Sequence, residues 1–325
     1  RGATAAFFLV MFAFNWFHSE QAIYALRLLH GCIFALATTA AAAMAALVLP
    51  ASRKGEGIGY FALSTNLAMV VGPLIGLLII GNLGGTALFA FMTALAILTF
   101  LTANARRLPD EVVCPAKRPK KGFHLSDFIE RRSLTPALLG GMVFFAYGGI
   151  LTFIPLYAKS LGLQAETSLF FVVFAFVIIL TRPVIGRLFD EKGPDWTVWP
   201  GFAFFAAGMV FFSQVTTLVG LLGAAALLGI GFGALSPAFQ TLAVQSAPAS
   251  RAGVATATYF WSLDISVGLA AVLLSIVAAQ CGYPFMYGAC CTAIIALNAA
   301  LYFLWRRSKL HKLRKLQKAR RAHSI

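Results

Sequence analysis

The sequence predicts an all-α membrane protein of about ten transmembrane helices in two bundles, with four helices in the first bundle and six in the second. Of its 325 residues, 60% are hydrophobic and only 11% are charged, whereas soluble domains average about half apolar and a quarter charged residues. The apolar residues form long segments near the length of about 20 residues that crosses a bilayer. A tetrapeptide that occurs twice indicates that the two bundles are related.

Ten segments are apolar and long enough, or nearly long enough, to span a membrane. In chain order they lie near 2–17, 22–49, 57–80, 85–104, 136–158, 167–185, 197–215, 218–246, 253–279 and 284–305. The first segment is the shortest. It lacks a small-residue cleavage site and further spans follow it directly, so it is interpreted as a helix and not as the core of a signal peptide.

Composition divides the chain into four regions. Residues 1–104 hold the four helices of an N-terminal bundle remnant, and residues 105–134 form a polar cytoplasmic linker. Residues 135–305 form a six-helix C-terminal bundle. Residues 306–325 form a basic cytoplasmic tail.

The repeated tetrapeptide is Pro50-Ala51-Ser52-Arg53, which returns 198 residues later as Pro248-Ala249-Ser250-Arg251. The same offset places Gly31 over Gly229 and Asn66 over Asp264. Internal symmetry of this kind is typical of membrane transporters built from two related bundles. By this offset, the counterparts of the first two helices after the linker would precede Arg1, which predicts that two helices are missing. The alternative is a ten-span protein that never had them.

The basic residues predict the orientation. Of the 26 lysines and arginines, Arg27 and Arg182 lie inside spans and Lys159 lies in a loop on one side, while the others lie on the opposite side. Because lysine and arginine accumulate in cytoplasmic loops, both termini are predicted to be cytoplasmic in a multi-pass plasma (inner) membrane protein.

The tail after Trp305 carries nine basic residues and no acid. Such clusters are attracted to anionic lipid headgroups by about 1 kcal/mol per charge. Nucleic acid is not an expected partner, because no aromatic residues are interleaved with these charges.

The sequence contains no catalytic Ser/His/Asp set, metal-ligand cluster or phosphate-binding loop. The five cysteines show neither a metal-binding nor a haem spacing. The chain is therefore not expected to be an enzyme, and no cofactor or metal is predicted.

Three stretches of the sequence contain motifs of charged residues and glycines within or beside the predicted spans. The first runs from Arg27 to Ala35 and contains His30 and Gly31. The second contains Gly59 and residues 68–77, which read AMVVGPLIGL. The third, residues 182–193, reads RPVIGRLFDEKG. Together they resemble the major facilitator superfamily, in particular its twelve-span drug/proton antiporter branch. In this comparison His30 stands where the family usually has Gln, and the third stretch is similar to the cytoplasmic loop motif of the second half.

The resemblance covers essentially the whole chain and implies a secondary active transporter that works by alternating access. Its implied activity is proton-coupled efflux of small hydrophobic or cationic compounds. The alternatives are a sugar or metabolite exporter of the same superfamily and a truncated fragment that does not transport. The residues expected to serve gating or structural roles by this resemblance are Gly31, Gly72, Pro73, Gly76, Arg182, Gly186, Arg187, Asp190 and Gly193.

Asp264 is the one acid of eleven that falls within a predicted span. It lies twelve residues beyond Ala252, or about 18 Å into the membrane at 1.5 Å per residue. An ionised carboxylate there costs at least about 3 kcal/mol, so Asp264 is predicted to face a cavity and exchange protons. The alternative is a carboxyl group bonded to a neighbouring helix, such as the one that carries Ser236.

Three further residues are candidates for proton or substrate coupling. Asn66 is the repeat counterpart of Asp264, and the two are predicted to line opposite walls of one cavity. The alternative for Asn66 is a simple hydrogen bond to a neighbouring helix. The resemblance implies a coupling role for Arg27, with snorkelling to the outer interface as the alternative. His30, three residues on, shares the face of Arg27 and belongs to the residue type that titrates near neutral pH.

Overall fold

The computed structural model of the chain describes residues 2–17, 19–48, 54–105, 129–164, 166–248 and 251–322. Within these ranges all regular structure is helical, which confirms the predicted all-α class. The first copy of the tetrapeptide and most of the linker lie outside the described residues. The chain divides into two compact units, Arg1–His124 and Leu125–Ile325, and each unit is described separately.

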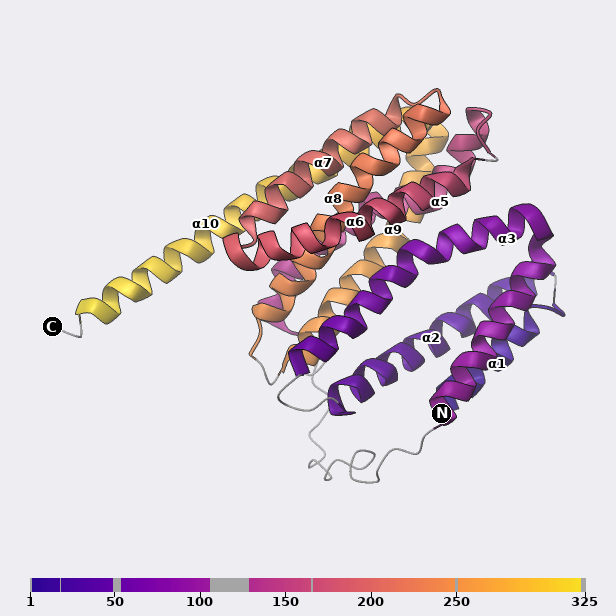
Figure 1. Ribbon diagram of the computed structural model, residues 1–325, viewed down its shortest axis with the longest axis horizontal. Helices are drawn as coiled ribbons and strands as arrows, with labels where there is room; N and C mark the ends of the chain where they lie inside the picture. The colour runs from indigo at the N-terminus through magenta and orange to yellow at the C-terminus, as the bar shows by residue number, and fades with distance from the viewer. Residues whose placement is uncertain are drawn as a thin grey trace. The chain divides into compact units, whose positions relative to one another are not determined.

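The first unit holds three helices, α1 (Gly2–Ala13), α2 (Glu20–Val48) and α3 (Lys54–Asn104). Helix α1 packs against both α2 and α3 (Figure 1). The buried side chains of Val10 and Met11 in α1, and of Phe14 directly after it, form a small core with Ala96 of α3. This core fixes the end of α1 and therefore the position of Phe14, which contributes to the site described below.

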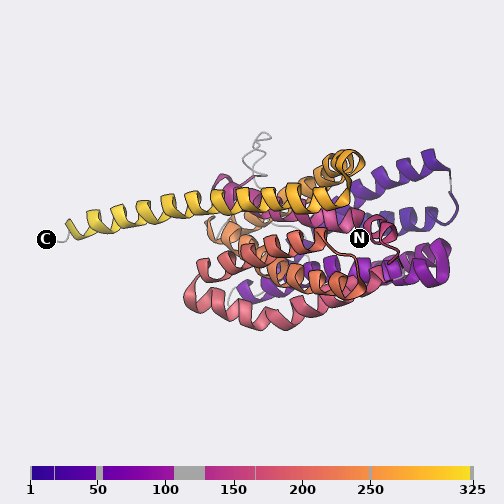
Figure 2. The ribbon, with the colours of Figure 1, turned by 90° about the horizontal axis from the view of Figure 1, so that it is seen from above.

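The second unit contains six α-helices and two short helical turns. They are η3 (Arg131–Ser133), α5 (Leu134–Ser160), α6 (Thr167–Lys192), α7 (Asp195–Ser213), α8 (Leu218–Gln245), α9 (Ala252–Phe285), η5 (Met286–Cys291) and α10 (Thr292–Ala322). Helix α5 packs along α9 and α8, while α6 and α7 pack on α8. Helix α10 contacts α5 and α7 and then continues beyond the other helices of its unit (Figures 1 and 2).

Glycines allow several of these helices to approach closely, because small residues let backbones come together. A Cβ added to Gly148 of α5 would lie 3.2 Å from the Cα of Val267 in α9. A Cβ added to Gly231 of α8 would lie 2.5 Å from the backbone nitrogen of Phe205 in α7. Gly231 is thus the point at which the backbones of α7 and α8 come together.

Replacing Gly231 with alanine is expected to destabilise the protein by about 1–3 kcal/mol, because the methyl group would force the α7 backbone away. The measurement is equilibrium unfolding of the purified protein in mixed detergent micelles. Gly268→Ala is the matched control, since no described atom lies within 4 Å of a Cβ added there. Equal stability of the two variants would contradict the packing described.

The described helices reproduce the repeat offset of 198 residues. Helices α2 and α8 start at Glu20 and Leu218, and α3 and α9 start at Lys54 and Ala252. Both members of the second pair are broken by a glycine at the corresponding place, Gly84 with φ 82° and Gly282 with φ 79°. Since positive φ is readily adopted by glycine alone, the same backbone requirement recurs at the same point of each unit.

Seven described segments are long and apolar enough to cross a membrane, and Gly2–Ala13 is a shorter apolar helix. Two of the seven, Val71–Asn104 and Ala252–Ser308, contain the breaks at Gly84 and Gly282. With these breaks counted, the described residues hold ten α-helical segments, four in the first unit and six in the second. Their order matches the ten predicted spans.

Candidate functional site

Asp264 lies on the exposed face of α9. It is the thirteenth residue of the helix, and the neighbouring side chains Trp261 and Ile265 are 61% and 48% exposed. The opposite face of α9, which includes Tyr259 and Leu263, is buried against the second unit. Asp264 therefore points away from the core of its own unit.

The carboxyl group of Asp264 makes no hydrogen bond or ion pair with the described residues. The alternative predicted from the sequence is a bond from Asp264 to the helix that carries Ser236. In the structure the contact between α9 and Ser236 is made instead by Tyr259, whose hydroxyl donates to the Ser236 backbone carbonyl at 2.7 Å. Within the described part of the chain, Asp264 is also the one acid placed more than two turns from either end of its helix. It is thus a carboxyl group in an apolar helix with no neutralising partner among the residues of the second unit that the structure describes.

Asn66 holds the position in α3 that Asp264 holds in α9. Each is the thirteenth residue of its helix, counted from Lys54 and from Ala252. The side chain of Asn66 lies outside those that the structure describes, so the equivalence concerns the backbone. The structure thus places both residues at the same depth of two helices related by the repeat.

Arg27 and His30 meet at an aromatic residue of the first unit that the sequence reasoning missed. The guanidinium carbon of Arg27 lies 5.3 Å from the ring centroid of Phe14, a cation–π distance. The His30 ring lies 5.1 Å from that of Phe7 and 6.3 Å from that of Phe14. Phe7 and Phe14 are seven residues apart, about two helical turns, and this spacing is the signal that could have found them.

The environment of His30 is apolar on several sides. Its ring also lies 6.2 Å from that of Phe34, and its Nε2 atom is buried without a hydrogen-bond partner among the described residues. Phe14 is in turn stacked on Phe89 of α3, with 5.6 Å between the ring centroids and 9° between the planes. The three helices of the first unit therefore build one cluster in which a cation and an imidazole share an aromatic wall.

The stretch predicted to be a cytoplasmic loop motif is helical in the structure. Helix α6 continues through Arg182, Gly186 and Asp190 to Lys192, beyond the predicted end of the span near 185. Gly193, with φ 90°, ends the helix, and its N–H donates to the Phe189 carbonyl at 3.0 Å. The loop prediction is wrong from 186 to 192, because the helix continues past Pro183 and Gly186 and ends only at Gly193.

Four of the glycines expected to serve structural or gating roles have no close neighbour among the described residues. No described atom lies within 4 Å of a Cβ added to Gly31, Gly72, Gly76 or Gly186. Pro73 lies inside α3, next to Gly72. In contrast, a Cβ added to Gly229, the repeat counterpart of Gly31, would lie 3.0 Å from the backbone carbonyl oxygen of Phe174 in α6.

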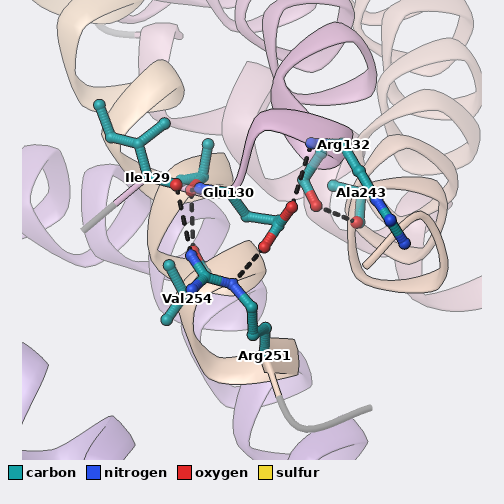
Figure 3. A network of polar contacts seen from close by, with 8 residues as sticks. Ile129, Glu130, Arg132, Ala243, Arg251 and Val254 are labelled. Atoms are coloured by element: carbon teal, nitrogen blue, oxygen red, sulfur yellow. Dashed lines mark hydrogen bonds and ion pairs between the residues drawn. The ribbon is translucent and has the colours of Figure 1, made fainter. Parts of the chain in front are cut away.

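A polar network joins the start of α5 to the start of α9 (Figure 3). Arg251, the last residue of the second tetrapeptide, forms an ion pair through Nε with the Oε2 atom of Glu130. The Oε1 atom of Glu130 accepts from the backbone N–H of Arg132 at 3.2 Å, and the Glu130 N–H donates to Thr258 at 2.9 Å. The Ser133 hydroxyl donates to the Ala243 carbonyl at 2.6 Å, which adds the end of α8.

The electrostatics of this network favour the ionised form of Glu130. The backbone N–H of Arg132 and the Arg251 side chain both donate to its carboxylate and lower the pKa of Glu130 below its ordinary value of 4.5. The Glu130 side chain is 8% exposed. The network therefore holds Arg251, at the start of α9, by a charge on Glu130 that is present at neutral pH.

Comparison with known proteins gives a consistent result. The model of the Major Facilitator Superfamily matches residues 2–271 and 166–324, which together cover nearly the whole chain. The chain is 24% identical over 281 residues to an uncharacterized MFS-type transporter of Methanocaldococcus jannaschii, covering 84% of this chain and 72% of that protein.

Uncharacterized MFS-type transporters of Burkholderia mallei and Burkholderia pseudomallei are 30% identical over 161 residues. These alignments cover 48% of this chain and 39% of each relative. The chain thus matches less than half the length of the Burkholderia proteins.

Proposed function

Because this chain belongs to the Major Facilitator Superfamily, we propose that it is a proton-coupled secondary transporter that exports small hydrophobic or cationic compounds by alternating access. We place it in the drug/proton antiporter branch, in the plasma membrane, with both termini in the cytoplasm. The family makes the chain a multi-pass membrane protein of a transporter class and not an enzyme. The coupling ion, the substrate class and the orientation are our proposals.

The observation that carries the proposal is the position of Asp264. Its carboxyl group lies on an exposed face of an apolar helix and has no partner among the described residues. Since a charge at this depth costs at least about 3 kcal/mol, the group is stable when protonated or when a cation neutralises it. Proton and cationic substrate therefore compete for one carboxylate, and such competition is sufficient for antiport.

Trp261 gives this site a second means of binding cations. It lies three residues before Asp264 on the exposed face of α9, so the two side chains are neighbours on the helix. An indole ring attracts cations over its face. An organic cation with apolar groups would thus find both an aromatic surface and a negative charge.

We assign supporting roles to the other candidates. Asn66 occupies the equivalent depth in α3 without a charge, which suits hydrogen bonding to substrate and not proton exchange. Arg27 and His30 form a second polar pair, held on the aromatic cluster of the first unit. We propose that this pair modulates coupling, and that the α6 motif with Gly72-Pro73 and Gly76 serves gating.

The test of the proposed function is transport in liposomes that contain the purified chain and an imposed pH gradient. A panel should include a lipophilic cation, a neutral hydrophobic dye, a sugar and an organic acid. We expect accumulation of the cation against its gradient, and its loss when a protonophore collapses the pH gradient. Movement of the sugar or organic acid alone would instead favour a metabolite exporter, and no movement of any compound would contradict transport by this chain.

A further inference from the structure

A pocket of about 210 Å³ lies within the second unit, between α6, α7 and α8. Helix α6 contributes Arg182, Gly186 and Asp190, which are spaced four residues apart and so lie on one face. Helix α7 contributes Thr197 and α8 contributes Thr241. The pocket is separate from the Asp264 face of α9, whose residues do not line it.

The charges of this pocket are not neutralised within the described part of the chain. The described residues form two ion pairs, Arg251 with Glu130 and Arg306 with Asp195. Neither pair involves Arg182 or Asp190. Arg182 is half-buried and lies ten residues before the end of α6. An arginine inside a membrane-spanning helix is costly and is normally paired, so this guanidinium lacks an anion.

Hydroxyl groups add hydrogen-bonding capacity beside the guanidinium. Thr197 is 2% exposed, and its Oγ1 atom is buried with no hydrogen-bond partner among the described residues. Buried hydroxyls are normally paired. Gly186 leaves space between the two charged residues of α6, since no described atom lies within 4 Å of a Cβ added there.

We propose that this pocket binds a singly charged oxyanion, either a carboxylate or a phosphodiester, with the anion on Arg182 and its oxygens accepting hydrogen bonds from Thr197 and Thr241. Arg182 supplies the planar guanidinium geometry that matches such groups. Asp190, two turns further along α6, repels additional negative charge and so disfavours dianions. The proposal is independent of proton coupling at Asp264.

The experiment measures binding to the purified full chain in detergent by the rise in its melting temperature and by equilibrium dialysis. The probes are benzoate, dimethyl phosphate, inorganic phosphate at pH 8 and phosphatidylglycerol. We expect the singly charged probes to bind more tightly than inorganic phosphate, which is mostly a dianion at this pH. Arg182→Gln should weaken their binding by about tenfold or more, because a charge-assisted hydrogen bond is lost.

The source of the anion is distinguished by which probes bind. Binding of phosphatidylglycerol alone would identify a lipid headgroup, whereas binding of dimethyl phosphate or benzoate would identify a soluble ligand, and either result supports the oxyanion site. Arg131→Gln removes the same charge from an exposed residue outside the pocket and should leave binding unchanged.

Two further variants keep the test decisive if Arg182→Gln does not fold. Arg182→Lys retains the charge and should bind the probes more weakly than the original protein, and Asp190→Asn should increase binding of inorganic phosphate at pH 8. The proposal is overturned if no probe binds the original protein. It is also overturned if every foldable Arg182 variant binds like the original while Asp190→Asn has no effect.

Discussion

Replacing Asp264 with asparagine is expected to reduce pH-driven accumulation of a cationic substrate to the level of protein-free liposomes. Asparagine retains the size and hydrogen-bonding capacity of the side chain but binds no exchangeable proton. Exchange of labelled for unlabelled substrate across the membrane needs no net proton movement, so we expect it to continue, although at higher substrate concentrations because the negative charge that attracts the cation is lost. The substitution is therefore expected to abolish the accumulation driven by the pH gradient and to retain exchange.

The assay compares both reactions in one liposome preparation. Asp264→Glu, which restores a titratable group, should recover part of the driven accumulation. Glu20→Gln is the matched control, because it removes an exposed carboxylate from the first residue of α2. Wild-type accumulation by the Asp264→Asn variant would remove Asp264 from the proton step.

Replacing Arg251 with glutamine is expected to lower the melting temperature of the protein by several degrees at neutral pH. The change removes the ion-pair partner of Glu130, which is largely buried at the junction of η3 and α9. It also removes the contact of Arg251 with the Ile129 carbonyl at 3.5 Å. A buried carboxylate that loses its cation is strongly destabilising.

The same network predicts the pH dependence of stability. The pKa of Glu130 in the folded protein is lowered from its ordinary value of 4.5, so its contribution is fully present above about pH 4.5. The contribution is lost as the pH falls through the lower folded-state pKa. Melting temperatures measured from pH 7 downward should therefore converge for the original protein and the Arg251→Gln variant.

Arg131→Gln is the control for this prediction, because the exposed Arg131 side chain makes no contact with Glu130 among the described residues and is not among the groups that lower its pKa. It should melt like the original protein at every pH. If Arg251→Gln also melts like the original at neutral pH, the ion pair does not stabilise the second unit.

The sequence was sufficient to predict the helices and their relation to one another. Apolar segment length determines where a chain can cross a bilayer, so the order of the spans followed directly from composition. The repeat offset found in one tetrapeptide reappears in the starts of α3 and α9 and in the breaks at Gly84 and Gly282. These features depend on the residues of one short segment at a time, so they can be predicted from the sequence.

The contacts between distant residues were not predictable in this way. The partners Glu130 and Arg251 are 121 residues apart, and Thr93 meets Asn15 across 78 residues. The depth of Asp264 could be counted, but the face of α9 that it occupies depends on which side packs against α5. The sequence of a membrane helix does not distinguish the side that packs against protein from the side that faces lipid, because apolar residues are suited to both.

Proton release by the purified protein tests the central claim most directly. In a weakly buffered detergent solution at neutral pH, addition of a transported cation should acidify the medium by about one proton per bound substrate if the cation displaces the proton held by Asp264. The Asp264→Asn variant lacks both this proton and the negative charge, so it should bind the cation more weakly and release no proton even at a saturating cation concentration. Equal proton release by both proteins would contradict the account.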